Sequence, residues 1–334
     1  MNKKKTSKKK AAVNSVNRFS GITLSNDTIF RGIFGQNDSI ELLEALVNAV
    51  LVNARKPPVK LEQILNPFQL EDLKGQKEPI LDILARDNRG QQVDVEVQVA
   101  NHDNFRERIL YYWSRVYSGQ LKEGQDYTEL RPVIAIVLVR FPIHARYRKE
   151  LWDAVKLIYQ RHSEELYTDH LSLHFVTIPE TLTEENAADI NEELTRWLKI
   201  MNYPNMKEDV KEMTQSDPNI AKTIEKVDQF LAIPQVCSYL EARRRAIATQ
   251  ATLMRTNLRK GIEKGMKKGL AKGRAETAVK DAKRLLLHRF GQLPPAVIQP
   301  LDQKLKSTPD EVECDRIVDL ALDCASLDEF LASL

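Results

Sequence analysis

The strictest alternation of apolar and polar positions in the chain lies between residues 92 and 99. Valine occupies every second position of this segment, and the positions between the valines are polar, among them Asp94, Glu96 and Gln98. Successive side chains of a strand point to opposite faces, so the segment is predicted to be a β-strand with one apolar and one polar face. Residues 79–86 are predicted to form the preceding strand. We therefore expect a hairpin over residues 79–99.

Hydrophobic periodicity predicts further elements on both sides of this hairpin. Apolar residues three or four positions apart indicate helices, and a continuous apolar run indicates a strand that is covered on both faces. The predicted helices are 26–34, 39–56, 104–121 and 152–166, and the predicted strands are 59–65, 132–140 and 171–178. Strand, helix and strand in succession imply a right-handed crossover to a parallel neighbour. Residues 20–180 are thus expected to form an α/β core with a mixed sheet flanked by helices.

The chain beyond residue 180 is predicted to be helical. We divide it into a helical extension (181–254), a basic glycine-repeat helix or linker (255–284) and a small helical C-terminal module (285–334). Four glycines recur every four residues in the middle part: Gly261, Gly265, Gly269 and Gly273. Each helical glycine costs about 0.5–1 kcal/mol relative to alanine, and the repeat therefore needs a compensation such as close approach to another helix. A marginal linker, a self-association helix and a DNA contact all remain open.

Composition narrows the class of protein. Hydrophobic residues make up 42% of the chain, which is ordinary for a globular protein with a packed core. No apolar run approaches the roughly 18 residues that a membrane-spanning helix needs. The three cysteines are far apart and odd in number, which argues against a disulfide framework or a cysteine-rich metal site. The N-terminus is too basic for a secretory signal, so we expect a cytoplasmic protein without a membrane partner.

Charge is small in total but unevenly distributed. The net charge is +3, yet residues 3–10 contain six lysines and no acid. Residues 255–284 contain eleven lysines and arginines against three acids. Two such segments on a nearly neutral chain suit a phosphate-backbone partner, although solvated tails have the same composition. Residues 1–18 are expected to be a disordered basic tail.

The predicted hairpin carries the chemistry. Asp82 interrupts an otherwise apolar strand, and Glu96-Val97-Gln98 lies on the next strand. If the two strands pair, the Asp82 and Glu96 carboxylates converge, and Asp94 could add a third oxygen ligand. Magnesium prefers such oxygen ligands and could activate a water for attack on a phosphodiester. The alternative is that the hairpin simply has one solvent-facing polar side.

These residues, in this order, resemble the PD-(D/E)XK nucleases, and more closely the family of PD-(D/E)XK nuclease transposases, or recombination-promoting nucleases. The segments that carry the resemblance are Asn26 to Gly35, Leu81 to Ala85, Val93 to Gln98, Arg108 to Trp113, Tyr117 to Leu121 and the strand opened by Arg131 to Ile134. The resemblance covers most of residues 22–180 and returns at the glycine repeat. It implies a restriction-endonuclease-like core that contains a metal-dependent active site.

The resemblance also implies roles for single residues. Asp82, Glu96 and Gln98 would be catalytic, with Asp82, Glu96 and the Val97 carbonyl holding Mg²⁺ or Mn²⁺. Gln98 stands where the wider superfamily has a lysine, and an amide can orient a water but cannot stabilise charge as lysine does. Asp27 matches an acidic residue near the first helix and could bind metal through water, although an aspartate there also stabilises a helix N-terminus.

The implied function is Mg²⁺-dependent endonuclease action on DNA with low sequence specificity, which could promote recombination. The candidate DNA-binding residues are Arg108, Arg115, Gln120, Lys264, Lys268 and Lys272. The alternative is a DNA-binding or self-associating scaffold whose nuclease-like core no longer cuts, and the sequence does not tell RNA from DNA. No strand-transfer signature supports transposition, and the six histidines form no convincing metal set. A homodimer is a hypothesis, because cutting both DNA strands together takes two active sites and the glycine repeat offers an interface.

Overall fold

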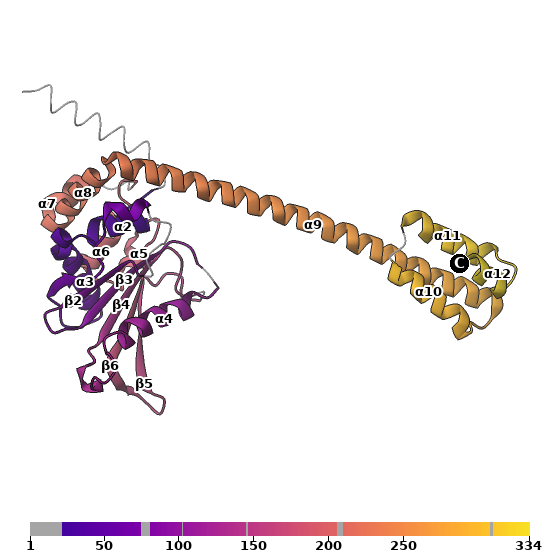
Figure 1. The fold of residues 1–334 in the computed structure, drawn as a ribbon, viewed down its shortest axis with the longest axis horizontal. Helices are drawn as coiled ribbons and strands as arrows, with labels where there is room; N and C mark the ends of the chain where they lie inside the picture. The colour runs from indigo at the N-terminus through magenta and orange to yellow at the C-terminus, as the bar shows by residue number, and fades with distance from the viewer. Residues whose placement is uncertain (1–21, 75–80, 102, 145, 206–209, 308–309) are drawn as a thin grey trace, which may run out of the picture. The chain divides into compact units, whose positions relative to one another are not determined.

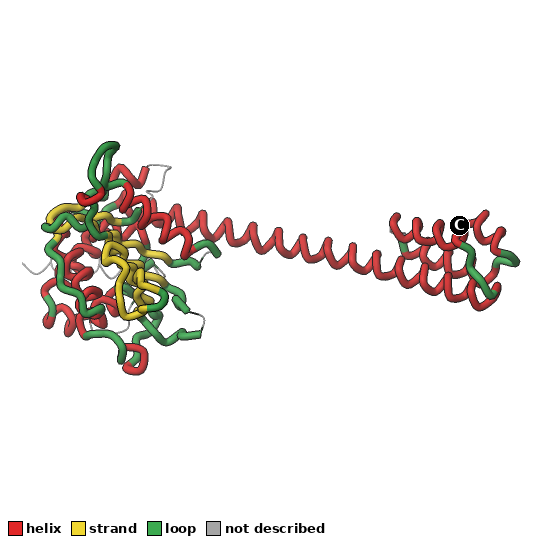
Figure 2. The backbone as a smooth tube through the Cα atoms, turned by 90° about the horizontal axis from the view of Figure 1, so that it is seen from below, coloured by secondary structure: helices red, strands yellow, loops and turns green. Residues whose placement is uncertain are grey.

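The computed structural model describes residues 22–74, 81–101, 103–144, 146–205, 210–307 and 310–334. The expected basic tail at residues 1–18 lies outside the described residues. The chain divides into two compact units, Met1–Leu240 and Glu241–Leu334. The first unit contains the sheet and the helices around it, and the second unit is helical (Figures 1 and 2).

The described strands form one six-stranded sheet in the order β1-β2-β3-β4-β6-β5. Their bounds are β1 Leu61–Ile64, β2 Ile83–Asp87, β3 Gln92–Gln98, β4 Val133–Val139, β5 Trp152–Tyr159 and β6 His162–Thr177. The three central strands β3, β4 and β6 are parallel, whereas the β1–β2, β2–β3 and β5–β6 pairs are antiparallel. The predicted mixed sheet and the parallel crossover between β3 and β4 are confirmed.

Two separate apolar layers cover the two faces of this sheet. Val93, Val95 and Val97 of β3 face the larger layer, which the helices α2, α3, α6 and α8 complete. The smaller layer consists of α4 residues packed on the odd-numbered positions of β4 and β6. The helices of the first unit are α2 Asp27–Phe34, α3 Ile40–Asn53, α4 Phe105–Ser118, α5 Glu184–Ala187, α6 Glu192–Ile200, α7 Val210–Ser216 and α8 Pro218–Leu231. The polar positions of β3 therefore lie on the α4 side of the sheet.

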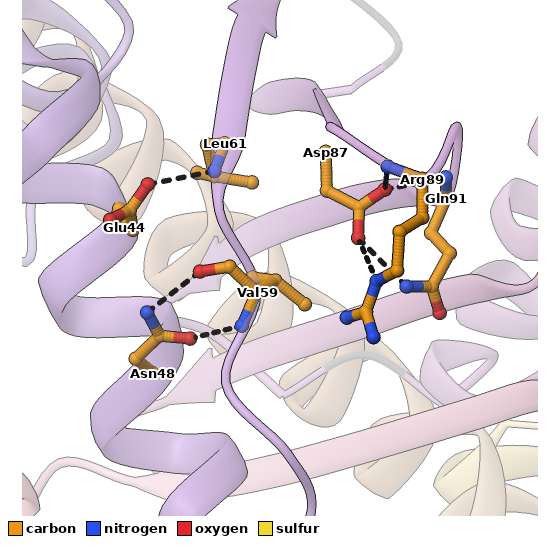
Figure 3. A network of polar contacts seen from close by, with 7 residues as sticks. All are labelled: Glu44, Asn48, Val59, Leu61, Asp87, Arg89 and Gln91. Atoms are coloured by element: carbon orange, nitrogen blue, oxygen red, sulfur yellow. Dashed lines mark hydrogen bonds and ion pairs between the residues drawn. The ribbon is translucent and has the colours of Figure 1, made fainter.

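Polar contacts hold the edge strand β1 and the turn of the β2–β3 hairpin in place. Asn48 of α3 donates to the Val59 carbonyl at 2.9 Å and accepts from the Val59 N–H at 2.8 Å, while Glu44 accepts from Leu61 at 2.7 Å (Figure 3). At the β2–β3 turn, the buried Asp87 carboxylate accepts from the backbone N–H groups of Arg89 and Gln91 at 2.9 and 2.8 Å. These bonds fix the edge strand β1 against α3 and close the hairpin whose other end carries the candidate site.

The helix predicted for residues 152–166 is wrong. This segment contains β5 and the beginning of β6, which pair antiparallel from Trp152–Val176 to Tyr159–His162. Residues 156–167 are almost all exposed, so a helix here would have no core to cover. β6 begins nine residues before its first pairing with β4 at Leu171, and β5 supplies backbone partners for that overhang. Pairing, rather than local periodicity, decides the structure of this segment.

The second unit is built around the C-terminal part of α9. This helix is continuous from Pro234 to Phe290, and it is followed by α10 Pro295–Ser307, α11 Glu311–Asp323 and α12 Leu327–Ser333. A small core joins the end of α9 to these three helices, with Leu286, Leu301, Ile317 and Phe330 fully buried. Among the residues with assigned positions, no helix combines the length and apolarity required to cross a membrane.

Candidate active site

Three acidic side chains gather where the open end of the hairpin lies beneath α4. Asp94 is opposite Leu84 of β2 and Ala135 of β4, so it occupies the middle of the sheet. Glu96 follows two positions later on the same face. Asp82 directly precedes β2, rather than lying within a strand as expected, and the hairpin register brings it opposite Glu96. The antiparallel pairing therefore brings together the carboxylates of Asp82 and Glu96, which lie fourteen residues apart in the sequence.

Backbone hydrogen bonds fix Asp82 and Glu96 to each other. The Val97 N–H donates to Asp82 Oδ2 at 2.8 Å, and the Asp82 N–H donates to Glu96 Oε1 at 3.1 Å. Arg31 of α2 donates through Nε to the Asp82 carbonyl at 3.1 Å. Asn66 donates to the neighbouring Leu81 carbonyl at 3.3 Å. These two residues hold the backbone at the site, and no sequence pattern had indicated them.

Asp94 differs from its neighbours because it is buried without adequate polar contacts. It is 1% exposed, and its Oδ1 has no hydrogen-bond partner. Burial, reinforced by the charge of Asp82, raises the pKa of Asp94 to about 8. Burial also raises the pKa of Glu96 well above its usual value, with further contributions from Asp82 and Asp94. The alternative of a solvent-facing polar side is wrong at Asp94, and the surroundings of the cluster do not supply enough hydrogen-bond donors and positive charge to keep all three carboxyl groups ionised.

α4 places Arg108 and Tyr112 toward this cluster. Arg108 lowers the pKa of Glu96 by its charge and donates a hydrogen bond to the Gln98 side-chain oxygen. Gln98 also donates from Nε2 to the Ala100 carbonyl at 2.7 Å. Tyr112 has a raised pKa because of burial, and Glu96, Asp82 and Asp94 add to that rise. Sequence reasoning missed Tyr112, although its position four residues after Arg108 places both on one helix face.

The remaining predicted site residues lie apart from this cluster or have other contacts. Asp27 is the first residue of α2, where its carboxylate accepts from the Thr28 N–H at 2.8 Å. Arg115 is exposed on α4, with its guanidinium 5.9 Å from the centre of the Tyr111 ring. Gln120 uses both ends of its amide to hold the backbone of Arg131, at 2.9 Å each. The three lysines proposed for DNA binding, Lys264, Lys268 and Lys272, are exposed on α9 in the second unit.

The cluster fits a divalent cation by charge and donor chemistry rather than by a ready-made ligand arrangement. Within the described part of the chain, no group of three or more histidine, cysteine, aspartate or glutamate side chains is arranged to hold a metal ion. However, Asp82, Asp94 and Glu96 supply only oxygen donors, and an oxygen of Asp94 is buried without a partner. Hard cations such as Mg²⁺ prefer such donors, and a cation would offset the excess negative charge.

A mixed sheet, with one acidic residue directly before a hairpin strand, another on the next strand and a helix crossing over them, is consistent with a PD-(D/E)XK-type fold. Residues 24–256 match the family of PD-(D/E)XK nuclease family transposases, and the chain belongs to this family. No curated protein and no solved structure matches the chain. Membership suggests a nuclease- or transposase-related function on DNA, and nucleases of this type typically use a divalent metal.

Proposed function

We propose that this protein is a metal-dependent endodeoxyribonuclease that hydrolyses DNA phosphodiester bonds with low sequence specificity. The observation that carries the proposal is the under-compensated acidic cluster of Asp82, Asp94 and Glu96 beneath α4. Two of these carboxyl groups have a raised pKa, because each is buried beside other acids. Carboxylates arranged at such a cost to stability are typical of functional sites.

Asp82, Glu96 and the Val97 carbonyl would hold Mg²⁺ or Mn²⁺, and Asp94 is the candidate additional ligand. When bound, such an ion lowers the pKa of a water and neutralises charge on the scissile phosphate. The chain contributes the positions of the donors. The Asp82–Val97 and Asp82–Glu96 bonds keep the two acidic residues at one end of the hairpin, and Arg31 and Asn66 restrain the backbone that carries Asp82.

Gln98 acts in this proposal as a positioning residue for Arg108. Its amide oxygen accepts from the Arg108 guanidinium, and its amide nitrogen is engaged by the Ala100 carbonyl. The positive charge that a lysine supplies elsewhere in the superfamily would here come from Arg108, whose planar fork suits a phosphate. Tyr112 would add a neutral hydrogen-bond donor on the same side, since its raised pKa keeps the phenol protonated.

The test is cleavage of supercoiled plasmid with Mg²⁺ or Mn²⁺, comparing wild type with Asp82→Ala and Glu96→Ala. Wild type is expected to nick or linearise the plasmid, both variants to lose cleavage, and EDTA to stop the reaction. Glu107→Ala is the matched control, because Glu107 is exposed on α4 beside Arg108. A parallel assay with single-stranded and structured RNA separates the two substrates.

Two outcomes would contradict the proposal. If cleavage survives both Asp82→Ala and Glu96→Ala, the active site lies elsewhere or the activity is a contaminant. If wild type binds DNA in a salt-sensitive way without cutting, and binding is indifferent to EDTA, the protein is a non-cutting scaffold with a nuclease-like core. Thermal melting of each variant distinguishes loss of the site from loss of the fold.

A further inference from the structure

An uncovered apolar stripe follows α9 between residues 247 and 273. Its members recur at spacings of four, three and four residues, so that the pattern repeats every eleven residues: Ile247, Ala251, Met254, Leu258, Ile262, Gly265, Gly269 and Gly273. At 100° per residue these positions keep to one side of a helix. An eleven-residue period is the pattern of helices that wind around each other with a right-handed supercoil.

The stripe has no partner within the described residues. Its four large side chains are between 55% and 66% exposed. A Cβ added at Gly265, Gly269 or Gly273 would meet nothing within 4 Å. Each helical glycine costs about 0.5–1 kcal/mol relative to alanine, so a chain that keeps them along an exposed helix needs something that uses their small size. Exposed apolar rows of this kind mark interaction surfaces.

We propose that this stripe pairs antiparallel with the same stripe of a second copy of the chain. The large residues lie in its N-terminal half and the glycines in its C-terminal half. In an antiparallel pair centred on residue 260, Ile247 lies opposite Gly273 of the second copy, and Ala251 lies opposite Gly269. Met254 lies within one residue of the level of Gly265 of the second copy, and Leu258 lies opposite Ile262. Each large side chain thus meets a glycine or a single aliphatic neighbour, on both sides of a two-fold axis.

Parallel pairing lacks this complementarity of size. It would set large residues against large residues in one half and glycines against glycines in the other, which leaves voids in the second half. Charge supports the same direction. Antiparallel pairing brings Arg244 opposite Glu276 and Glu241 beside Lys280, whereas parallel pairing would set each of these charges against itself.

The positive charge of α9 lies mostly away from the stripe, although Arg255 and Lys272 fall at the edges of its arc at 100° per residue, where long side chains can extend into solvent. Lys260, Lys264 and Lys267 occupy the opposite side of the helix at 100° per residue. They are exposed, and repulsion between such solvated charges weakens with salt.

The mass of the full-length protein tests the pairing. Light scattering over a concentration series up to about 100 μM should give twice the 38.3 kDa chain mass for wild type. Leu258→Lys should shift the mass to that of a single chain. Leu253→Lys is the matched control: Leu253 is 58% exposed on the same helix but lies off the stripe, so this variant should remain a dimer. A wild-type monomer throughout, or equal disruption by both variants, would overturn the proposal.

Crosslinking tests the direction. A tagged Ala251→Cys chain mixed with an untagged Gly269→Cys chain should form a disulfide-linked pair on mild oxidation. Ala251→Cys alone should not, because its two copies would lie 18 residues apart in register, or about 27 Å along the helix. Efficient crosslinking of Ala251→Cys to itself would overturn the antiparallel arrangement. Wild type, which keeps Cys237, Cys314 and Cys324, provides the background for both experiments.

Discussion

Two aspartates of the β2–β3 hairpin, Asp87 at its turn and Asp94 beneath α4, are each 1% exposed. Asp87 accepts four hydrogen bonds, two from backbone N–H groups and two from the side chains of Arg89 and Gln91 (Figure 3). Asp94 has an oxygen without any partner and a pKa raised to about 8. Equal burial thus has two meanings: donors make the first carboxylate part of the fold, and their lack makes the second a candidate for function.

The largest expected difference between substitutions at these two aspartates is in the rate of plasmid cleavage. Asp94→Ala is expected to lower the rate of plasmid cleavage by about 10³-fold, or ~4 kcal/mol, since it removes a candidate metal ligand from the acidic cluster. Asp87→Asn should leave the rate within about threefold, provided that the assay is run below its melting temperature. Rates are measured under single-turnover conditions. Equal losses in the two variants would mean that Asp94 matters to the fold only.

Substitution of the two aspartates by asparagine should change the free energy of unfolding in opposite directions. In EDTA at pH 7, Asp94→Asn is expected to raise the free energy of unfolding by about 1–2 kcal/mol, because folding at this pH forces the buried Asp94 carboxyl to take up a proton, whereas asparagine is neutral in both states. Asp87→Asn should lower it by about 2 kcal/mol, because it breaks charge-assisted hydrogen bonds at the turn. Urea denaturation measures both. If both substitutions lower the free energy of unfolding, the Asp94 carboxyl makes stabilising polar contacts in the folded protein, and the contrast with Asp87 fails.

The sequence predicted which acidic residues lie together better than it predicted their environment. Valine alternation identified β3, because period-two patterns report which side chains share a face, and the apolar run that contains Asp82 identified the other hairpin strand. The same alternation could not tell whether α4 covers the polar face, so it left open a solvent-facing Asp94. Arg31 and Asn66 were missed since their contacts depend on tertiary packing, and the 152–166 segment was mistaken for a helix because its partner strand lies later in the chain.

The opposite face of the sheet offers a second buried titratable group. His174 is fully buried, with one ring nitrogen bonded to Ser172 and the other without a partner. Burial, with the charges of Lys56 and Lys156, lowers its pKa from 6.5 to about 4. The unfolded chain therefore takes up a proton first as pH falls, and this histidine alone should lower the free energy of unfolding by about 2 kcal/mol between pH 7 and pH 5. Asp94 has the reverse sign: its raised pKa destabilises the fold as pH rises from about 4 to about 8.

His174→Gln isolates the histidine contribution to this pH dependence. Between pH 7 and pH 5, the free energy of unfolding of wild type should fall by about 2 kcal/mol relative to that of the variant, because only wild type carries the histidine contribution. Urea denaturation at each pH provides the measurement. An unchanged pH slope in the variant would assign the acid sensitivity to other groups.

The smallest expected effect is stabilisation by the metal itself. A ligand that binds only the folded state at ten times its Kd raises the free energy of unfolding by about 1.4 kcal/mol, which corresponds to a melting temperature about 2 °C higher for a chain of this size. Mg²⁺ or Mn²⁺ should produce this shift in wild type and in Asp87→Asn, but not in Glu96→Ala. The shift of Asp94→Asn should be smaller than that of wild type, because a neutral amide attracts a cation less than a carboxylate does. This holds even though the variant starts from a higher melting temperature. A metal-induced shift of equal size in all four proteins would place the binding site outside the hairpin and remove the physical link between the unpartnered Asp94 oxygen and the cation.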